Sequence, residues 1–286
     1  MPQGSILGPL GFIIYVNDIP NSVPDLSLIL FADDTSAFTS HKDLSTLNNI
    51  MNNGLSKLNT WFKSNKLSLN LNKTNYMLLG TRNKTNQSKD KFKLSIDDTE
   101  VKEVSTFKFL GITVDQNLTW KNHVDDLAKK CSRSIGILHK VKQFLPESAL
   151  LSLYYTLFLS HINYGITAWS SANSVDKDRL HVLQKRALRA VSNSEYRSHS
   201  NPLFIKYNQL KISDLCNHNI GIFMYKYCNN LLPSSFNNMF KTNAENHDYN
   251  TRNALNFAYL PMKVYNRNNT NLEQPPYSIS KNHNVV

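Results

Sequence analysis

Two adjacent aspartates inside an apolar segment constrain the chain more than any other feature of its sequence. Residues 28–38 read LILFADDTSAF, with Asp33 and Asp34 at the centre. From Leu26 to Leu30 leucines occupy every second position, the period of a strand with one buried face. The β-branched and aromatic residues that follow favour a second strand. The segment therefore predicts a tight hairpin with both aspartates at its tip.

The aspartate pair has two interpretations. Asp is common in turns because its carboxylate accepts hydrogen bonds from nearby backbone N–H groups. Here, however, no Gly or Asn eases the turn, and two adjacent carboxylates at the edge of a core repel each other. A divalent cation removes that repulsion, and carboxylate oxygens suit Mg²⁺ or Mn²⁺. Asp33 and Asp34 are therefore candidate metal ligands, with a plain turn as the alternative.

The composition favours a globular protein with a polyanionic partner. The 286 residues are enough for one large or two ordinary domains, and 41% of them are hydrophobic. Lys and Arg total 32 against 21 acidic residues, which gives a net charge of +11 and a pI near 9.4. Such an excess of positive charge favours nucleic acid as a partner.

The cysteines argue against a disulfide framework, because they are odd in number and contain no Cys-x-x-Cys pair. They are Cys131, Cys216 and Cys228. A zinc site made of Cys216, His218 and Cys228 would have a spacing that fits no familiar site. We therefore prefer buried cysteines on helices.

Secretion and membrane insertion are both disfavoured. The first residues, MPQGSILGPLGF, lack the basic start of a signal peptide, so we expect an intracellular protein, cytoplasmic or nuclear. Residues 148–175 contain no Asp, Glu, Lys or Arg, a length that could span a bilayer. They also carry Asn, His, Gly and several Tyr residues, which favour a buried helix with a following turn and no membrane contact.

The periodicity predicts an α+β part followed by an all-helical part. Ser5 is a candidate N-cap of a helix that runs to about Asn17, and apolar residues at three- and four-residue steps predict an amphipathic helix from Leu44 to Phe62. Short strands are expected at 76–79, 92–96 and 107–114, with TRNKTNQSKDK as a hairpin loop or insert. Residues 120–232 have a helical pattern, and we expect the Asn-rich tail 233–286 to be poorly ordered.

The predicted helix 120–141 has two different faces. One is an apolar stripe made of Trp120, Val124, Leu127, Cys131, Ile135 and Leu138. On the opposite face Lys129, Arg133 and Lys140 recur at helical spacing, diluted by two aspartates. That face is either an ordinary solvated surface or a surface that lies along a phosphate backbone.

Several ordered motifs resemble reverse transcriptases of jockey-like non-LTR retrotransposons. PQGSILGPLGFIIYVNDIP is similar to the loop–helix motif of these enzymes, and FADD to their active-site motif. WFKSNKLSLNLNKTNYMLLG resembles the next motif, and FKFLGITVD resembles the primer-grip hairpin. LLSLYYTLFLSHINYGITAW, LQKRALRAV and HDYNTRN are similar to segments further downstream, so the resemblance covers roughly residues 1–255.

The resemblance implies a truncated polymerase palm, an antiparallel sheet with helices, over residues 1–115. A helical thumb and connection would follow over 118–232. The implied activity is RNA-directed DNA synthesis by nucleotidyl transfer with two Mg²⁺ or Mn²⁺ ions. Its partners would be an RNA template, a DNA primer and deoxynucleoside triphosphates.

The resemblance also implies roles for individual residues. Asp33 would be a direct metal ligand, Asp34 a weaker one, and Lys73 a catalytic cation near the triphosphate. Gln3 and Gly4 would lie beside the incoming nucleotide and the template, and the primer grip would comprise Phe109, Leu110 and Gly111. Each role has a plain alternative: a buried strand for the last three residues, a solvated lysine after a turn for Lys73, and a loop before a helix for Gly4.

One part of the implied site lies outside this sequence. In the family another carboxylate comes from a strand ahead of the loop–helix motif, whereas this sequence starts within that motif at Met1-Pro2-Gln3. We therefore expect an incomplete two-ion site and a fragment, from a truncated gene model or a decayed copy, that is inactive alone because the upstream carboxylate and the fingers are missing. Upstream endonuclease and fingers portions of the same element are possible partners. The alternative is a non-catalytic relic that binds nucleic acid.

Overall fold

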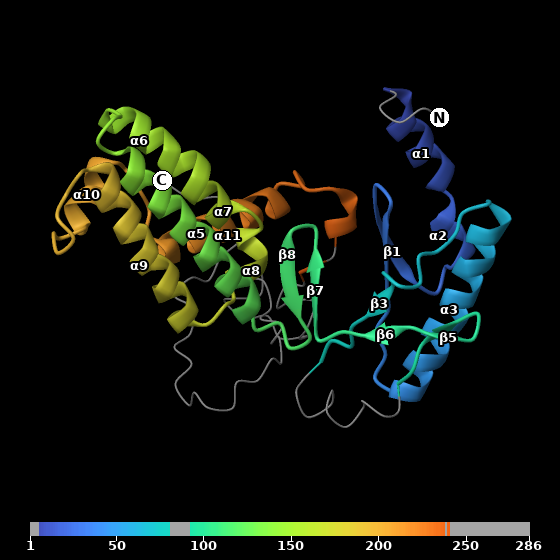
Figure 1. Ribbon diagram of the computed structural model, residues 1–286. Coiled ribbons are helices and arrows are strands. Elements are labelled where there is room, and N and C mark those ends of the chain that lie inside the picture. Colours follow the sequence, from blue (N-terminus) through green and yellow to red (C-terminus); the bar gives the residue numbers. More distant parts are fainter. Residues whose placement is uncertain (1–5, 81–91, 238, 241–286) are drawn as a thin grey trace. The chain divides into compact units, whose positions relative to one another are not determined.

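The structure is a computed structural model that describes residues 6–80, 92–237 and 239–240 (Figure 1). The chain divides into two compact units, residues 1–107 and 108–286, and each is described by itself below. The first unit combines helices with small sheets, and the second is mainly helical, which confirms the α+β class. The candidate N-cap Ser5, the insert at 81–91 and most of the tail lie outside the described residues.

The first unit contains short strands in pairs. Its elements are α1 (Leu7–Val16), α2 (Ile19–Ser22), β1 (Ser27–Phe31), β2 (Asp34–Phe38), α3 (Leu44–Ser64), β3 (Asn75–Tyr76), β4 (Ser95–Ile96), β5 (Thr99–Glu100) and β6 (Lys102–Glu103). β1 pairs with β2 and β4 with β5 in antiparallel fashion, while β3 and β6 are parallel. The strands predicted at 76–79 and 92–96 were too long, because Phe92 and Leu94 are buried without joining a ladder.

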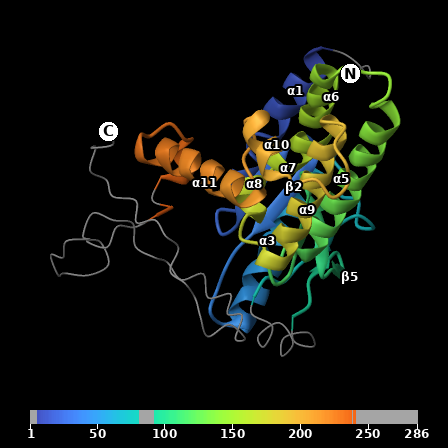
Figure 2. The same cartoon turned by 90° about the vertical axis from the view of Figure 1, so that its left-hand side faces the viewer.

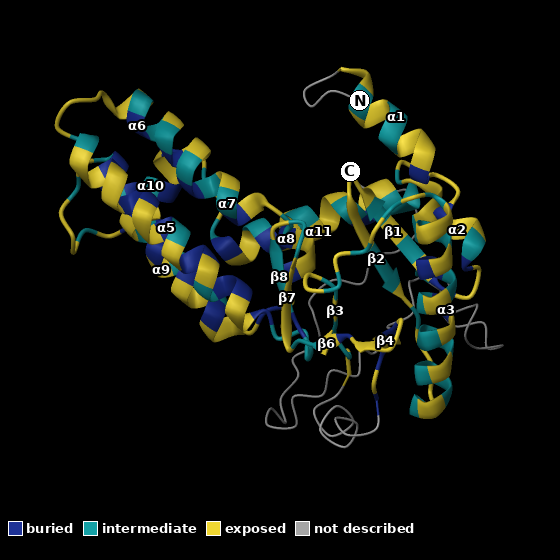
Figure 3. Cartoon of the chain, turned by 45° about the vertical axis from the view of Figure 1, so that its right-hand side comes forward, coloured by how far each residue is buried: buried dark blue, intermediate teal, exposed yellow. Residues whose placement is uncertain are grey.

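Helix α3 confirms the amphipathic helix expected at 44–62. Its start is fixed by Asp43, whose carboxylate accepts a hydrogen bond from the Thr46 backbone N–H at 2.8 Å. Hydrogen bonds from Ser45 and Thr46 hold the pKa of the Asp43 carboxyl well below its usual range. The half-buried Met51 and Leu55 of α3 contact both apolar clusters of this unit. Exposed and half-buried residues alternate along the helix (Figure 3).

A glycine on α3 sets how closely the aspartate hairpin approaches the helix. A Cβ atom at Gly54 would lie 2.3 Å from Cδ1 of Leu26, the residue just before β1. Leu26 is buried and belongs to the same apolar cluster as Leu58. The absence of a side chain at Gly54 therefore lets Leu26 pack directly on the helix and anchors the base of the hairpin.

The second unit begins with a hairpin and continues as helices. Strand β7 (Thr106–Phe109), which starts at the end of the first unit, pairs with β8 (Ile112–Asp115). The helices are α5 (Lys121–Val141), α6 (Glu147–Leu153), a π-helix (Tyr154–Leu159), α7 (Ser160–Asn163), α8 (Ile166–Trp169), α9 (Ser174–Val191), α10 (Asn201–Lys206) and α11 (Ile212–Cys228), followed by the 3₁₀ turn Ser234–Phe236. Helices α5 and α9 run side by side (Figures 1 and 2).

The core of the second unit confirms the apolar stripe expected on α5. All six predicted stripe residues are buried there, together with the aromatic side chains Tyr154, Phe158 and Trp169. Cys131 is fully buried, and burial raises the pKa of its thiol to about 12. Cys216 is also buried, whereas Cys228 at the end of α11 is half-buried. Residues 148–175 form several short helices, and no described helix is long and apolar enough to cross a membrane.

Candidate functional site

The aspartates lie at the tip of the expected hairpin, which β1 and β2 form. Phe31 pairs with Asp34, so Ala32 and Asp33 form a two-residue turn. Ala32 has φ 52°, a conformation that favours glycine, and a positive φ at the first turn residue is a feature of tight hairpin turns. A non-glycine residue there costs on the order of 1 kcal/mol or more, and such strain is found preferentially at functional sites.

The hairpin presents a buried face and an exposed face. Leu28, Leu30 and Ala37 pack on the apolar cluster of the first unit, as the alternation predicted. Ile29, Phe31 and Phe38 on the opposite face are 43%, 58% and 49% exposed. Asp34 is directly opposite Phe31 and so belongs to this exposed face, while Asp33 extends from the turn itself. The Asp33 side chain therefore belongs to the turn, whereas the Asp34 side chain belongs to the exposed face of the hairpin.

Both carboxylates are available to a ligand. Asp33 and Asp34 are exposed, and within the described residues neither side chain has a hydrogen bond or an ion pair. Two unpartnered, adjacent carboxylates fit a divalent cation such as Mg²⁺ as part of a ligand set. Within residues 6–80 and 92–240, residue 238 excepted, the structure contains no group of three or more His, Cys, Asp or Glu side chains that could hold a metal ion. Cys216, His218 and Cys228 therefore do not form such a group.

The remaining polymerase candidates of the first unit are only partly described. Lys73 is exposed in a turn that is closed by a hydrogen bond from its backbone N–H to the Asn70 carbonyl oxygen, at 3.0 Å. Its ammonium group has no ion pair within the described residues. Gln3 and Gly4 lie outside the described residues.

The primer-grip candidates occupy a hairpin turn in the second unit. Phe109 ends β7, and Leu110 and Gly111 form the turn with φ values of 44° and 85°. Positive φ at both turn residues is the pattern of a type I′ turn, which accounts for the glycine. The alternative of a buried strand was wrong, because Leu110 is half-buried and Gly111 exposed. The hydroxyl of Tyr164 donates a hydrogen bond to the Leu110 carbonyl oxygen and ties this turn to the helices.

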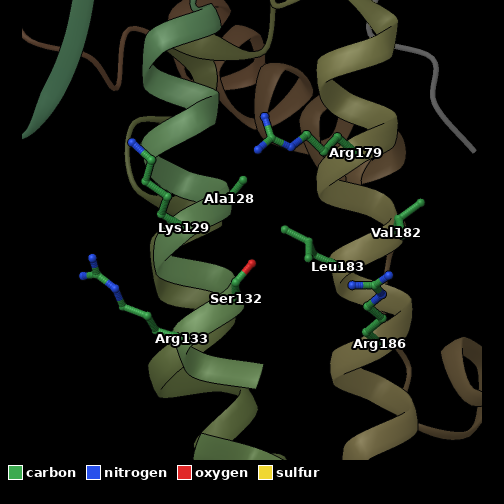
Figure 4. Close-up of a pocket in the computed structure, with 8 residues that line it drawn as sticks. All are labelled: Ala128, Lys129, Ser132, Arg133, Arg179, Val182, Leu183 and Arg186. Carbon is green, nitrogen blue, oxygen red and sulfur yellow. The ribbon is translucent and has the colours of Figure 1, made fainter. Parts of the chain in front are cut away.

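The cationic face of α5 borders a groove that sequence reasoning did not identify. A hollow of about 560 Å³ lies between α5 and α9, and its lining includes Lys129, Ser132, Arg133, Arg179, Val182 and Arg186 (Figure 4). We call it the α5–α9 groove. Lys140 is exposed on α5 but does not line the groove. Arg179 and Arg186 were missed, although their spacing of seven residues on α9 places them on one helix face.

The cations of the groove are only partly neutralised. Arg179 forms an ion pair with Asp125, and Lys129 one with Asp126 at 3.4 Å. Both pairs are largely exposed, so they add little stability. Within the described residues Arg133 has no ion pair, which leaves positive charge along this side of α5.

A second hollow adjoins the groove. It measures about 230 Å³, and Lys129 and Arg133 line both hollows. Its other lining residues include Lys108, Gly111, Thr113, His123 and Lys130. Lys129 and Arg133 therefore connect the α5–α9 groove with the hollow beside the β7–β8 turn, whose lining also includes Asp126.

Comparison with known proteins agrees with the motif resemblance. Residues 1–114 match the family model described as "Reverse transcriptase (RNA-dependent DNA polymerase)". Over 206 residues the chain is 20% identical to the RNA-directed DNA polymerase from mobile element jockey and 26% identical to the probable RNA-directed DNA polymerase from transposon BS, both of Drosophila melanogaster. It is 25% identical over 174 residues to the Pol polyprotein of the type-1 retrotransposable element R1 2 of Nasonia vitripennis.

These alignments cover a larger part of this chain than of its relatives. The jockey and BS alignments each cover 68% of this chain and 22% of the relative, and the R1 2 alignment covers 59% and 42%. The chain thus spans less than half the length of these relatives. No solved structure matches the chain significantly. Residues 1–114 are thus similar to the reverse transcriptase family, and residues beyond this match extend a distant similarity to the RNA-directed DNA polymerase of the mobile element jockey.

Proposed function

We propose that residues 1–286 are part of an RNA-directed DNA polymerase and carry one acidic element of its metal site. The observation that supports this most directly is the strained two-residue turn that exposes the unpartnered carboxylates of Asp33 and Asp34. In this proposal residues 1–115 are a partial palm, and residues 118–232 are the thumb and connection. The family match over residues 1–114 supports the first assignment.

The proposed chemistry is nucleotidyl transfer from a deoxynucleoside triphosphate to a DNA primer paired with an RNA template. Bound Mg²⁺ or Mn²⁺ would supply activation of the primer hydroxyl and charge stabilisation of the phosphates. Asp33 would be the principal carboxylate ligand and Asp34 the weaker one. Lys73, an exposed ammonium group without an ion pair in the described residues, would contribute positive charge near the triphosphate.

The helical unit would hold the template–primer. Phe109, Leu110 and Gly111 would contact the primer end, and the fixed turn suits this role because Tyr164 restrains its backbone. Lys129, Arg133 and Lys140 on α5 would contact phosphates. Gln3 and Gly4 would approach the nucleotide and the template.

The active site needs a further carboxylate. The polymerases that this chain resembles take it from a strand ahead of the loop–helix motif, in a region that continues into the fingers. We therefore propose that residues 1–286 alone do not extend a primer. Without the groups that position template and nucleotide, the reaction loses several orders of magnitude in rate.

The test is primer extension on an RNA template with Mg²⁺ or Mn²⁺. The chain alone is compared with the chain joined to the coding sequence that precedes Met1, each with and without Asp33→Asn. We expect extension only by the joined protein and its loss in the variant. Extension by residues 1–286 alone that disappears in Asp33→Asn would show that the site is complete within this chain.

A second function is favoured by the cationic surface of the second unit. Lys129 and Arg133 line two adjoining hollows without any need for the metal site. The chain could therefore act as a non-catalytic nucleic-acid-binding protein. A stop codon or scrambled sequence ahead of Met1 would favour this alternative, and an open frame with an acidic strand motif would favour the polymerase.

A further inference from the structure

We propose that the α5–α9 groove binds a single nucleic-acid strand, with its phosphates against the four lining cations and a base stacked on Tyr196. This inference builds on the proposed function and adds a binding site, the contribution of α9 and the form of the ligand. It rests on three observations: the shape of the groove, its charge and an exposed aromatic residue at one of its cations.

The groove places cations from two helices around one hollow. On α5, Lys129 and Arg133 are one helical turn apart, and on α9, Arg179 and Arg186 are two turns apart. Figure 4 shows Arg179 extending from α9 towards α5, while Lys129 and Arg133 extend along the far side of α5. A phosphate chain that lies in the hollow and crosses over α5 can therefore meet Arg179 and Arg186 in the hollow and Lys129 and Arg133 on α5.

The existing ion pairs do not satisfy these cations. Lys129 and Arg179 keep 67% and 51% of their side chains exposed although each pairs with one aspartate. The two aspartates balance at most half of the four positive charges. Phosphates that replace these weak pairs would release condensed counterions, which supplies most of the affinity of non-specific nucleic-acid binding.

The groove also has surface that suits sugars and bases. Its lining includes the apolar side chains of Ala128, Val182 and Leu183, and Val182 is 46% exposed. Small side chains at Ala128 and Ser132 face α9 and keep the hollow open (Figure 4). A purely inorganic polyanion would gain nothing from this apolar surface, whereas a nucleotide strand would.

An exposed aromatic ring is held beside the groove by one of its cations. The Arg186 guanidinium lies 5.8 Å from the centre of the Tyr196 ring and donates a hydrogen bond to the Tyr196 hydroxyl oxygen at 3.2 Å. The Tyr196 side chain is nevertheless 71% exposed. A positively charged groove combined with an aromatic platform is the pattern by which proteins hold single strands without reading their sequence. Paired bases are stacked within a duplex and cannot use such a platform, so the pattern favours a single strand.

The test measures binding of the full chain to a fluorescein-labelled 20-nucleotide oligo(U), by anisotropy over a range of NaCl concentrations in EDTA. Arg179→Ala/Arg186→Ala should lower the magnitude of the slope of log K against log[NaCl] by about 1.4, since each single-strand phosphate contact contributes roughly 0.7. At 0.1 M salt this corresponds to a loss of affinity of roughly 25-fold. Arg179→Lys/Arg186→Lys keeps the charges and should keep the slope.

The aromatic contribution is separated by two further variants. Tyr196→Ala should weaken binding by roughly tenfold with the salt slope unchanged, because stacking involves no ion release. Tyr196→Phe retains the ring and should bind like the native chain. Circular dichroism of each variant confirms that the helices are intact.

The matched control, Lys121→Ala/Lys142→Ala, replaces the first residue of α5 and the residue that follows its end, both of them cations outside both hollows. An equal loss of affinity in this control would overturn the groove as the binding site. An unchanged slope of log K against log[NaCl] in Arg179→Ala/Arg186→Ala would overturn it as well. Tighter binding of a matched RNA–DNA duplex than of the single strand, with the same dependence on Arg179 and Arg186, would overturn the single-strand assignment. Because the assay needs no metal or nucleotide, these results are independent of whether the chain supports primer extension.

Discussion

The Tyr164 hydroxyl donates a hydrogen bond to the backbone carbonyl oxygen of Leu110, fifty-four residues earlier in the chain. The same ring lies against Gly111, where an added Cβ atom would be 3.3 Å from Tyr164 Cε1. Tyr164, the residue that follows α7, thus fixes the turn of the β7–β8 hairpin. The turn that we propose contacts the primer end is therefore held from outside the hairpin.

This contact predicts that Tyr164→Phe lowers the stability of the second unit by about 0.5–1 kcal/mol, the usual net value of a hydrogen bond at a partly exposed site. Gly111→Ala should cost more, because it adds a side chain at φ 85° next to the ring. Chemical unfolding followed by circular dichroism measures both. Tyr225→Phe, on a 64% exposed side chain of α11, is the control. Equal stability of Tyr164→Phe and the control would contradict a restraining role.

The start of α5 depends on one buried carboxylate. Asp115 is 7% exposed and accepts hydrogen bonds from the backbone N–H groups of Asn117, Thr119 and Trp120, at 3.1, 3.0 and 2.9 Å. Asp115→Ala would leave these donors without their partner, so we expect a loss of about 2–4 kcal/mol. The melting temperature of the full chain checks this against Asp178→Ala, which removes an exposed carboxylate of α9. A melting temperature of Asp115→Ala within a degree of the control would refute the assignment.

The stability of the second unit should fall in mild acid. The Nδ1 atom of His123 accepts a hydrogen bond from the Thr113 backbone N–H at 3.3 Å, and burial together with the nearby Lys130 lowers the pKa of His123. The unfolded state, with a His pKa near 6.5, therefore binds the proton more tightly than the folded state. The contribution of neutral His123 to the free energy of unfolding is present above pH 6.5 and is lost as the pH falls through the pKa of His123 in the folded state.

Unfolding free energies between pH 5 and 8 test this dependence. His123→Gln should flatten the pH profile, although a slope should remain because burial also lowers the pKa values of His161 and His181. An unchanged slope in the variant would show that His123 does not contribute. The opposite sign, greater stability at pH 5, would contradict the burial argument for all three histidines.

The parts of the fold that sequence could predict are those set by local periodicity. Alternation from Leu26 to Leu30 was sufficient for the β1–β2 hairpin, and three- and four-residue steps were sufficient for α3 and α5. Asp115 escaped notice because its hydrogen bonds depend on a tight loop, with Trp120 at φ 64°, that no hydrophobic pattern signals. The groove was missed for a different reason: Arg179 meets Asp125 across fifty-four residues, and only the packing of α9 on α5 brings them together.

The charge on α5 gives a further prediction about binding. Replacing Lys129, Arg133 and Lys140 together with Ala should weaken salt-sensitive binding of RNA and of RNA–DNA hybrid and flatten its salt dependence, since each lost phosphate contact removes a released counterion. Filter binding at several salt concentrations provides the measurement. Since Lys140 lies outside the groove, Lys129→Ala/Arg133→Ala should account for most of the effect on single strands. An unchanged salt slope in the triple variant would reject this face of α5.

The last prediction separates the two aspartates in the protein joined to its upstream sequence. Asp33 extends from the turn, whereas Asp34 lies on the exposed strand face opposite Phe31, so the two carboxylates cannot approach one cation equally. We expect Asp33→Asn to abolish primer extension at any Mg²⁺ concentration. The Asp34→Asn variant should still extend the primer measurably, but it should need a higher Mg²⁺ concentration to reach its maximal extension rate. The measurement is the extension rate against Mg²⁺ concentration, with Asp25→Asn, whose exposed carboxylate pairs with Lys57 at 3.0 Å, as the control. Greater damage from Asp34→Asn than from Asp33→Asn would reverse the assigned roles.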